Sequence, residues 1–177
     1  RVSVASDGTE ADLWSLDPAL SADGRFVAFW SGASNLVAGD TNGSFDVFVH
    51  DRSTGVTSRA SVASGGAQAD GYSARPAISA DGRFVTFDSG APNLVAGDTN
   101  GATDVFVHDR ATGVTSRVSV ASDGAQADGG GFNPTISADG RHIAFGSHST
   151  DLVPGDTNGA GDVFVHDRST GVTTRVS

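Results

Sequence analysis

The sequence of 177 residues contains no cysteine and no lysine, and of its 21 acidic residues only Glu10 is a glutamate. Without cysteine the chain has no disulfide and no thiolate for catalysis or metal binding. Aspartate is favoured in turns whereas glutamate is favoured in helices, so the acidic residues indicate a chain rich in turns. No apolar run approaches the roughly 20 residues of a membrane-spanning helix, and we expect no membrane insertion.

The formal net charge of −10 disfavours two classes of partner, nucleic acids and anionic membrane surfaces, because both repel a negatively charged protein. The chain starts at Arg1 rather than at a methionine. This start is expected of a mature product or of a fragment, and a signal peptide that had been removed would leave no trace in it.

One stretch of the sequence, Gly-Asp-Thr-Asn-Gly-x-x-Asp-Val-Phe-Val-His-Asp-Arg, occurs at Gly39–Arg52, Gly97–Arg110 and Gly155–Arg168, with a constant step of 58 residues. A second block, Ser-Ala-Asp-Gly-Arg, recurs with the same step and starts at Ser21, Ser79 and Ser137. Self-similarity at a fixed period is the signature of a repeat architecture. We therefore interpret residues 1–177 as one array of three units.

Each unit is expected to form four short strands, because runs of β-branched and aromatic residues alternate with turn residues. In the second unit the strands are predicted at Ala77–Ser79, Phe84–Phe87, Asp104–His108 and Val114–Val120. A proline precedes the first strand of every unit and fits a strand's first position, where a missing N–H does least harm. No segment has helical periodicity, and glycine is too frequent for helices.

The loops between these strands alternate in length. Asp81-Gly82 is a tight hairpin signal, and Asp109–Gly113 is a turn with glycine at its left-handed position. The other two connections of each unit are long. In an antiparallel meander the two long loops lie at the same edge of the sheet, and this edge is where we expect function, since binding residues concentrate in loops.

Two motifs of each unit resemble a known repeat. Pro-x-Ile-Ser-Ala-Asp-Gly-Arg with its following Phe-ended strand, and then Asp-Val-Phe-Val-His-Asp, are similar to the WD40-like (PD40) propeller repeat of the TolB type. The resemblance implies an all-β propeller of four-stranded antiparallel blades, at approximately residues 17–64, 75–122 and 133–177, with residues 1–6 as the end of a preceding outer strand. It also implies a secreted, periplasmic or cell-surface protein that binds other proteins more often than it catalyses.

Three blades do not close a ring, since propellers typically use about 4–8. We expect two chains to pair head-to-tail as a homodimer with six blades. The alternatives are a piece of a longer array and a cut-down or engineered propeller. A closed threefold β fold, such as a β-trefoil or β-prism, is the second choice for the fold.

The Asp-x-Asn-Gly-x-x-Asp loops are candidate calcium sites, one per repeat, because each gathers three oxygen-bearing side chains within seven residues. The pattern is not that of an EF-hand, and the competing interpretation is an Asx turn in which these side chains bind nearby backbone N–H groups. The candidate ligands are Asp40, Asn42 and Asp46, then Asp98, Asn100 and Asp104, then Asp156, Asn158 and Asp162.

Aromatic residues occur where the three units differ, in or beside the long loops, and exposed rings there would contact a sugar or anchor a partner protein. The competing interpretation is packing over the ends of the blades. The candidate ligand-binding residues are Trp14, Trp30, Tyr72, Arg75, Phe132 and His148.

Each unit also carries a His-Asp pair beside a tight turn, as at His108-Asp109. A catalytic site usually assembles different residues once, so a pair present in every repeat is more typical of structure. The arginines of the Ser-Ala-Asp-Gly-Arg blocks are expected either to form ion pairs between blades or to be solvated. The sequence thus favours a non-enzymatic binding or scaffold module, with a lectin as the alternative and a hydrolase or lyase as the least supported function.

Overall fold

The computed structural model describes residues 1–177 and contains twelve β-strands and no helix, so none of its elements is a helix that could cross a membrane. The strands form three four-stranded antiparallel sheets, each a simple meander in chain order. The first sheet comprises β1 (Ser15–Leu20), β2 (Phe26–Ser31), β3 (Asp46–Asp51) and β4 (Val56–Arg59). The second comprises β5 (Ser73–Ile78), β6 (Phe84–Ser89), β7 (Asp104–Asp109) and β8 (Val114–Arg117). The third comprises β9 (Phe132–Ile136), β10 (His142–Ser147), β11 (Asp162–Asp167) and β12 (Val172–Arg175).

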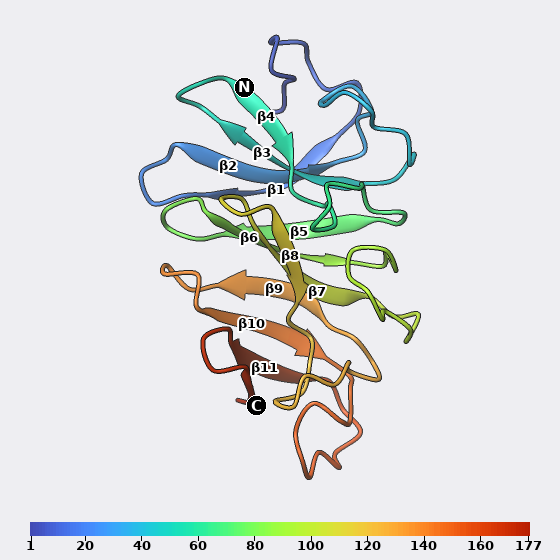
Figure 1. Ribbon diagram of the computed structural model, residues 1–177. Helices are drawn as coiled ribbons and strands as arrows, with labels where there is room; N and C mark the ends of the chain where they lie inside the picture. Colours follow the sequence, from blue (N-terminus) through green and yellow to red (C-terminus); the bar gives the residue numbers. More distant parts are fainter.

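The three sheets are stacked face to face, and the two chain termini lie at opposite ends of the stack (Figure 1). Strand β5 contacts both β1 and β9, and these three strands form the inner side of the array, whereas β4, β8 and β12 are outermost in their sheets. The tight hairpins lie along one edge of the stack and the long loops along the other (Figure 1). The all-β prediction with four-stranded units is confirmed, and the closed threefold fold is wrong because the chain forms three separate sheets rather than one sealed unit.

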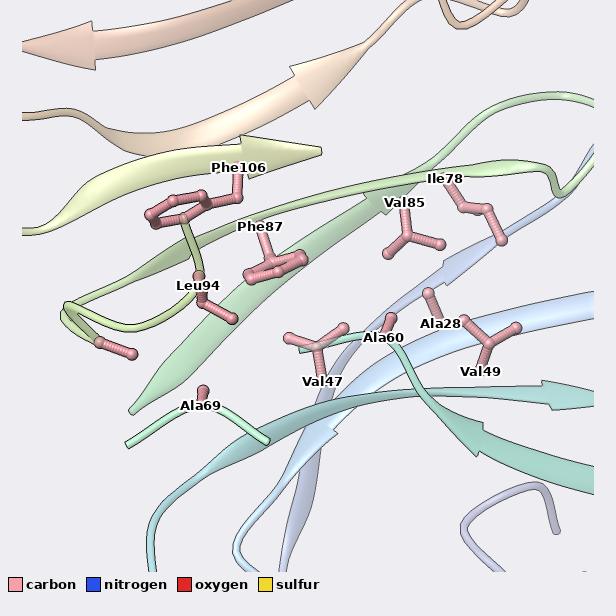
Figure 2. Packing of buried hydrophobic residues seen from close by; sticks show 11 residues of the cluster. Ala28, Val47, Val49, Ala60, Ala69, Ile78, Val85, Phe87, Leu94 and Phe106 are labelled. Atoms are coloured by element: carbon pink, nitrogen blue, oxygen red, sulfur yellow. The ribbon is translucent and has the colours of Figure 1, made fainter. Parts of the chain in front are cut away.

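The hydrophobic core lies between the sheets rather than within one of them. Ala28, Val47 and Val49 of the first sheet pack against Ile78, Phe87 and other residues of the second sheet (Figure 2). An equivalent cluster joins the second and third sheets. A strand buried from both sides needs apolar residues on both of its faces, which explains the unbroken apolar runs of β3 and β7.

The inner strands are longer than predicted and contain a bulge. In β5 the pairing with β6 shifts register between Ala74 and Ala77, so Pro76 lies inside the strand and not at its start. The prediction for proline is wrong in position, because β5 is an edge strand whose bulge removes a ladder N–H and so tolerates the ring. The residue before the proline of each inner strand adopts a left-handed backbone, with φ of 47° at Asp17, 52° at Arg75 and 53° at Asn133.

The fourth strand is shorter than predicted and ends at Arg117. Beyond it the Ser119 hydroxyl accepts a hydrogen bond from the backbone N–H of Val105, which ends the regular ladder. The chain then forms a small hairpin that Val120 and Gln126 close. Residues 1–6 are likewise no strand: Val4 pairs with Glu10, and its carbonyl accepts a hydrogen bond from Thr57 of β4.

The arginines of the Ser-Ala-Asp-Gly-Arg blocks pair within their own blade. Arg83 binds Asp109 with two hydrogen bonds of 2.8 and 2.7 Å, so the interpretation as ion pairs between blades is wrong. The arginine that contacts a neighbouring blade at this edge is Arg110, whose guanidinium lies 4.4 Å from the centre of the Phe26 ring. The same ring packs on Gly82, where an added Cβ would lie only 2.1 Å from it.

Candidate functional site

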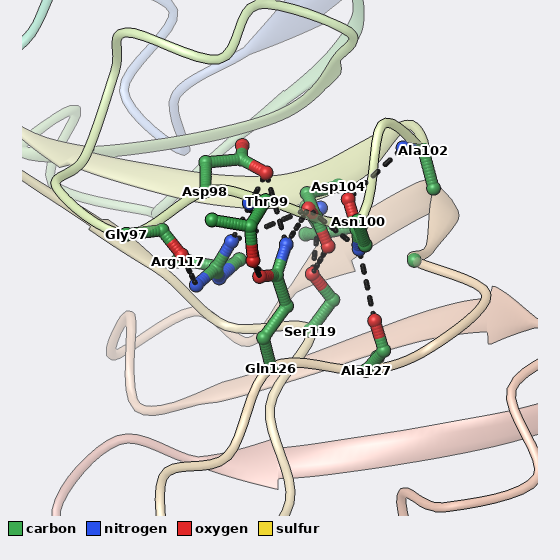
Figure 3. Close-up of polar contacts among 12 residues, drawn as sticks. Gly97, Asp98, Thr99, Asn100, Ala102, Asp104, Arg117, Ser119, Gln126 and Ala127 are labelled. Atoms are coloured by element: carbon green, nitrogen blue, oxygen red, sulfur yellow. Dashed lines mark hydrogen bonds and ion pairs between the residues drawn. The ribbon is translucent and has the colours of Figure 1, made fainter.

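The Asp-x-Asn-Gly loops build one polar cluster per blade, at the end of the sheet that carries the long loops. Figure 3 shows the cluster of the second blade, which brings together the loop before β7, the end of β8 and the linker that follows β8. Its centre is Asp104, the first residue of β7, whose side chain is completely buried. An aspartate at such a place must be paired with donors, because an unpaired buried charge is very costly.

The loop before Asp104 is an Asx turn. Asn100 accepts a hydrogen bond from the backbone N–H of Ala102 at 2.9 Å, and Gly101 between them has a φ of 65°. The Asn100 amide donates to the Ala127 carbonyl at 2.9 Å and to Asp104 at 3.2 Å (Figure 3). The local hydrogen bonds of the turn interpretation are therefore present, and asparagine also ties the loop to the linker.

A buried arginine bridges the two carboxylates of the cluster. Arg117, the last residue of β8, lies 3.4 Å from Asp98 and 3.5 Å from Asp104 (Figure 3). Ser119 donates a hydrogen bond of 2.5 Å to Asp104. Burial nevertheless raises the pKa of Asp104, since desolvation outweighs the hydrogen bonds and the arginine charge. The same bridge recurs in the other blades through Arg59 and Arg175.

Calcium at these loops stays a prediction. The guanidinium lies between the two carboxylates that would hold the ion, so a cation would have to displace it. No three carboxylate or imidazole groups converge anywhere in the structure in a manner suited to a metal. Calcium needs six to eight oxygen ligands, which one asparagine, backbone carbonyls and water would have to complete here.

The predicted aromatic ligands are distributed over the blades and do not form one pocket. Trp14 is the most exposed of them, at 69%. Rings cover glycines in every blade, but from different strands or loops: Phe45 covers Gly32, Tyr72 covers Gly90, and in the third blade His148 covers Gly161 and Phe132 covers Gly146. The packing interpretation therefore accounts for Tyr72 and His148, and Phe132 packs on His148 with ring centres 5.4 Å apart.

Trp30 and Arg75 lie in a second cluster, on the inner side of the array. The Trp30 indole N–H donates to Asp17 at 2.8 Å, and Arg75 binds Asp88 at 2.9 Å. The backbone N–H of Asn133 donates to the same Asp88 oxygen at 3.0 Å, and this bond joins the second blade to the third. The site prediction omitted Asp17, Asp88 and Asn133, although these are positions at which the three copies differ, and that divergence was a usable signal.

The His-Asp pairs have structural partners. His108 is hydrogen-bonded through Nδ1 to Thr115, and the Thr115 hydroxyl donates to the Val62 carbonyl in the linker before that blade. Burial lowers the pKa of His108. Asp109 accepts from Arg83 and from the backbone N–H of Ala111 in the turn. Both members of the pair are therefore bound to the fold, and neither faces a cavity.

The last sheet leaves open a face that is buried elsewhere in the array. Val163 of β11 is 44% exposed, whereas Val47 and Val105, its counterparts in the other sheets, are fully buried. Val176 is 62% exposed and its counterpart Val118 is 2% exposed. A pocket of about 280 Å³ lies on this face, with Phe132, Gly146 and Val163 among its lining residues.

No protein-family model matches the sequence, and no curated protein matches it. Solved structures do match. The protein assigned as TolB from Agrobacterium tumefaciens is 19% identical, with a TM-score of 0.59 over 92% of this chain and 49% of that one. The β-propeller domain of the trilobed protease from Pyrococcus furiosus is 14% identical, with a TM-score of 0.57 over 95% and 45% of the two chains.

An acylaminoacyl peptidase from Pyrococcus horikoshii is also similar, with a TM-score of 0.53 and 14% identity over 93% of this chain and 24% of that one. Identities this low show the fold alone. The three sheets are therefore propeller blades, and the chain spans about half the length of the first two structures.

Proposed function

We propose that these three propeller blades form a non-enzymatic binding module that acts outside the cytoplasm and completes a six-bladed ring with a second copy of the chain. The observation that carries the proposal is the open face of the third blade. Val163 and Val176 belong to a surface that, in the first two blades, is buried by the next blade. The opposite face of the first blade repeats the sequence that the second blade packs against the first, and Leu20 there is 59% exposed whereas its counterpart Ile78 is 9% exposed.

The hydrogen bonds between blades support the same arrangement. The Ala80 N–H of the second blade donates to Ala138 of the third at 2.9 Å, and Ala22 N–H donates to Ala80 in the same way. At the two ends of the array this series of hydrogen bonds stops, so the Ala138 N–H and the Ala22 carbonyl have no neighbouring blade to pair with. Two chains joined head-to-tail would pair these groups at both junctions.

The mass of the 177-residue chain in solution tests the ring. We expect twice the 17.8 kDa of one chain. The variant Val163→Asp should be a monomer, since it places a charge where the partner's blade would pack. Val172→Asp is the matched control, because Val172 is equally exposed, at 43%, but its counterparts Val56 and Val114 are also exposed within the array. A wild-type monomer, or a dimer that Val163→Asp leaves intact, contradicts the ring.

The distribution of charge supports binding at the edge with the long loops. Six aspartates and six arginines lie in the tight turns, and their charges cancel. The remaining 15 acidic and 5 basic residues therefore carry the whole net charge of −10. These lie in the linkers, the long loops, the inner strands and the strand ends beside them. A partner protein with a basic surface would be attracted to this edge.

A cationic peptide, polyarginine, tests the charge argument. We expect salt-sensitive binding that weakens when the exposed residues Asp12, Asp70 and Asp128 are changed together to asparagine. The matched control changes Asp23, Asp81 and Asp139, in the tight turns, to asparagine and should leave binding unaltered. Equal losses in the two triple variants would show that the long-loop edge is not the preferred surface.

A further inference from the structure

A cluster on the inner strands differs from the rest of the molecule because its residues occur once and not three times. We propose that Asp17, Arg75 and Asn133, with Trp30 and Asp88 beside them, bind a neutral saccharide on the inner side of the array. The three leading residues occupy one equivalent position of the three blades, yet they are an acid, a base and an amide. The other polar clusters recur with the same residue types in every repeat, whereas this cluster combines different residue types.

The backbone directs these three side chains in an unusual way. They are the only residues other than glycine with positive φ, and each precedes a proline, a position that normally favours extended backbone. The strain lies at the bulge of each inner strand, and strained backbone persists where the surrounding fold enforces it, often at binding sites. All three residues are exposed.

The hydrogen bonds within the cluster leave donors and acceptors free. Arg75 makes one hydrogen bond, to Oδ2 of Asp88, and 49% of its side chain is exposed, so its other N–H groups face solvent. Asp17 uses one oxygen for the Trp30 indole. Asn133 contributes its backbone N–H to Asp88, while its side-chain amide makes no hydrogen bond within the protein.

Asp88 supplies an independent observation. Its side chain is fully buried between Arg75 and the Asn133 N–H, and its Oδ1 has no hydrogen-bond partner in the protein. Native proteins rarely leave a buried carboxylate oxygen unpaired, and an ordered water is one group that satisfies such an atom and relays its hydrogen bond to a ligand. The cluster therefore has hydrogen-bonding capacity that the protein itself does not use.

The chemistry favours sugar hydroxyls. A hydroxyl both donates and accepts, so adjacent hydroxyls of one sugar ring suit an arginine, a carboxylate and an amide at the equivalent positions of successive inner strands. Trp30 lies at the same place, since its indole N–H is hydrogen-bonded to Asp17, so a sugar that binds Asp17 would change the surroundings of the indole. Two carboxylates against one arginine make the cluster negative, which disfavours uronates and other anions. All five residues belong to one chain, so the site does not depend on ring closure.

Fluorescence of Trp30 tests the proposal, because the chain contains only two tryptophans and Trp14→Phe leaves Trp30 as the sole indole. The protein is titrated with neutral cello-, malto-, xylo- and chito-oligosaccharides. We expect saturable binding of at least one of them. Asp17→Asn and Arg75→Lys should each weaken it by about tenfold or more, since each alters a hydrogen bond to a charged group. Asp123→Asn, in a distant linker hairpin, is the control.

Thermal melting of each variant shows that it is folded, and Arg75→Lys keeps the charge that Asp88 requires. The proposal is overturned if no neutral saccharide binds, if Asp17→Asn and Arg75→Lys bind as the parent does, or if only uronates or a basic peptide respond. Because the experiment is read on one chain, a monomeric protein that binds sugar would refute the ring and leave this site standing.

Discussion

Replacing Arg117 by alanine tests the role of the buried bridge most directly. The arginine side chain is 10% exposed, and the two carboxylates that it joins, Asp98 and Asp104, are 5% and 0% exposed. Removing one partner of a buried ion pair leaves an uncompensated charge and costs about 3–5 kcal/mol. For a protein of this size that loss lowers Tm by roughly 6–20 °C.

The third blade provides the matched control within the same chain. Arg175 makes the same bridge, but it is 30% exposed, because no further blade covers it. Water then solvates the carboxylates that remain after Arg175→Ala, so we expect a clearly smaller loss of stability. Denaturant unfolding followed by circular dichroism measures the free energy of unfolding of both variants under the same conditions.

The pH dependence of the difference between Arg117→Ala and the wild type gives a second measurement. Burial raises the pKa of Asp104 above its ordinary 3.8, so the folded state binds its proton more readily than the unfolded state, and its protonation favours folding as the pH falls. Without Arg117 that pKa rises further. The destabilisation should therefore shrink between neutral pH and pH 4. A loss that equals that of Arg175→Ala, or one that stays constant with pH, refutes the assignment of a buried bridge.

Three further predictions concern the turns and the loops. Gly113→Ala should lower the free energy of unfolding by about 1–2 kcal/mol, because Gly113 has a left-handed backbone. Gly82→Ala should lower it by about 1–3 kcal/mol more, because the added methyl also meets the Phe26 ring. Equal losses of stability in thermal melts would contradict this packing. Hydrogen bonds from Arg83 lower the pKa of Asp109, so the stability that this pair adds is present above pH 3.8 and is lost as the pH falls below it. When the free energy of unfolding is measured against pH, the curves of Arg83→Gln and of the wild type should therefore converge below pH 3.8. Parallel curves would argue against the pair. A chelator should leave Tm unchanged, because arginine already bridges the loop carboxylates; a rise of Tm on adding calcium would instead support the calcium prediction.

Much of the architecture was predictable because the signals are local and repeated. The 58-residue step, the Asp-Gly hairpins and the apolar runs identified four strands per unit, and the alternation of loop lengths placed the long loops at one edge. The position of Pro76 and the end of the fourth strand were mispredicted. A bulge depends on pairing with a neighbouring strand, and β8 ends where the Ser119 hydroxyl takes the N–H of Val105, a contact between residues 14 apart.

The amino-acid sequence alone determined the repeat, the all-β class and the residues of each turn, since these follow from the period of apolar side chains and from backbone preferences within a few residues. Only the tertiary structure decided that Arg117 lies between Asp98 and Asp104, that Asp88 joins Arg75 to the backbone of Asn133 on the inner side, and that the third blade keeps an open apolar face. Such contacts join residues far apart in sequence, and they form only when whole sheets pack against one another.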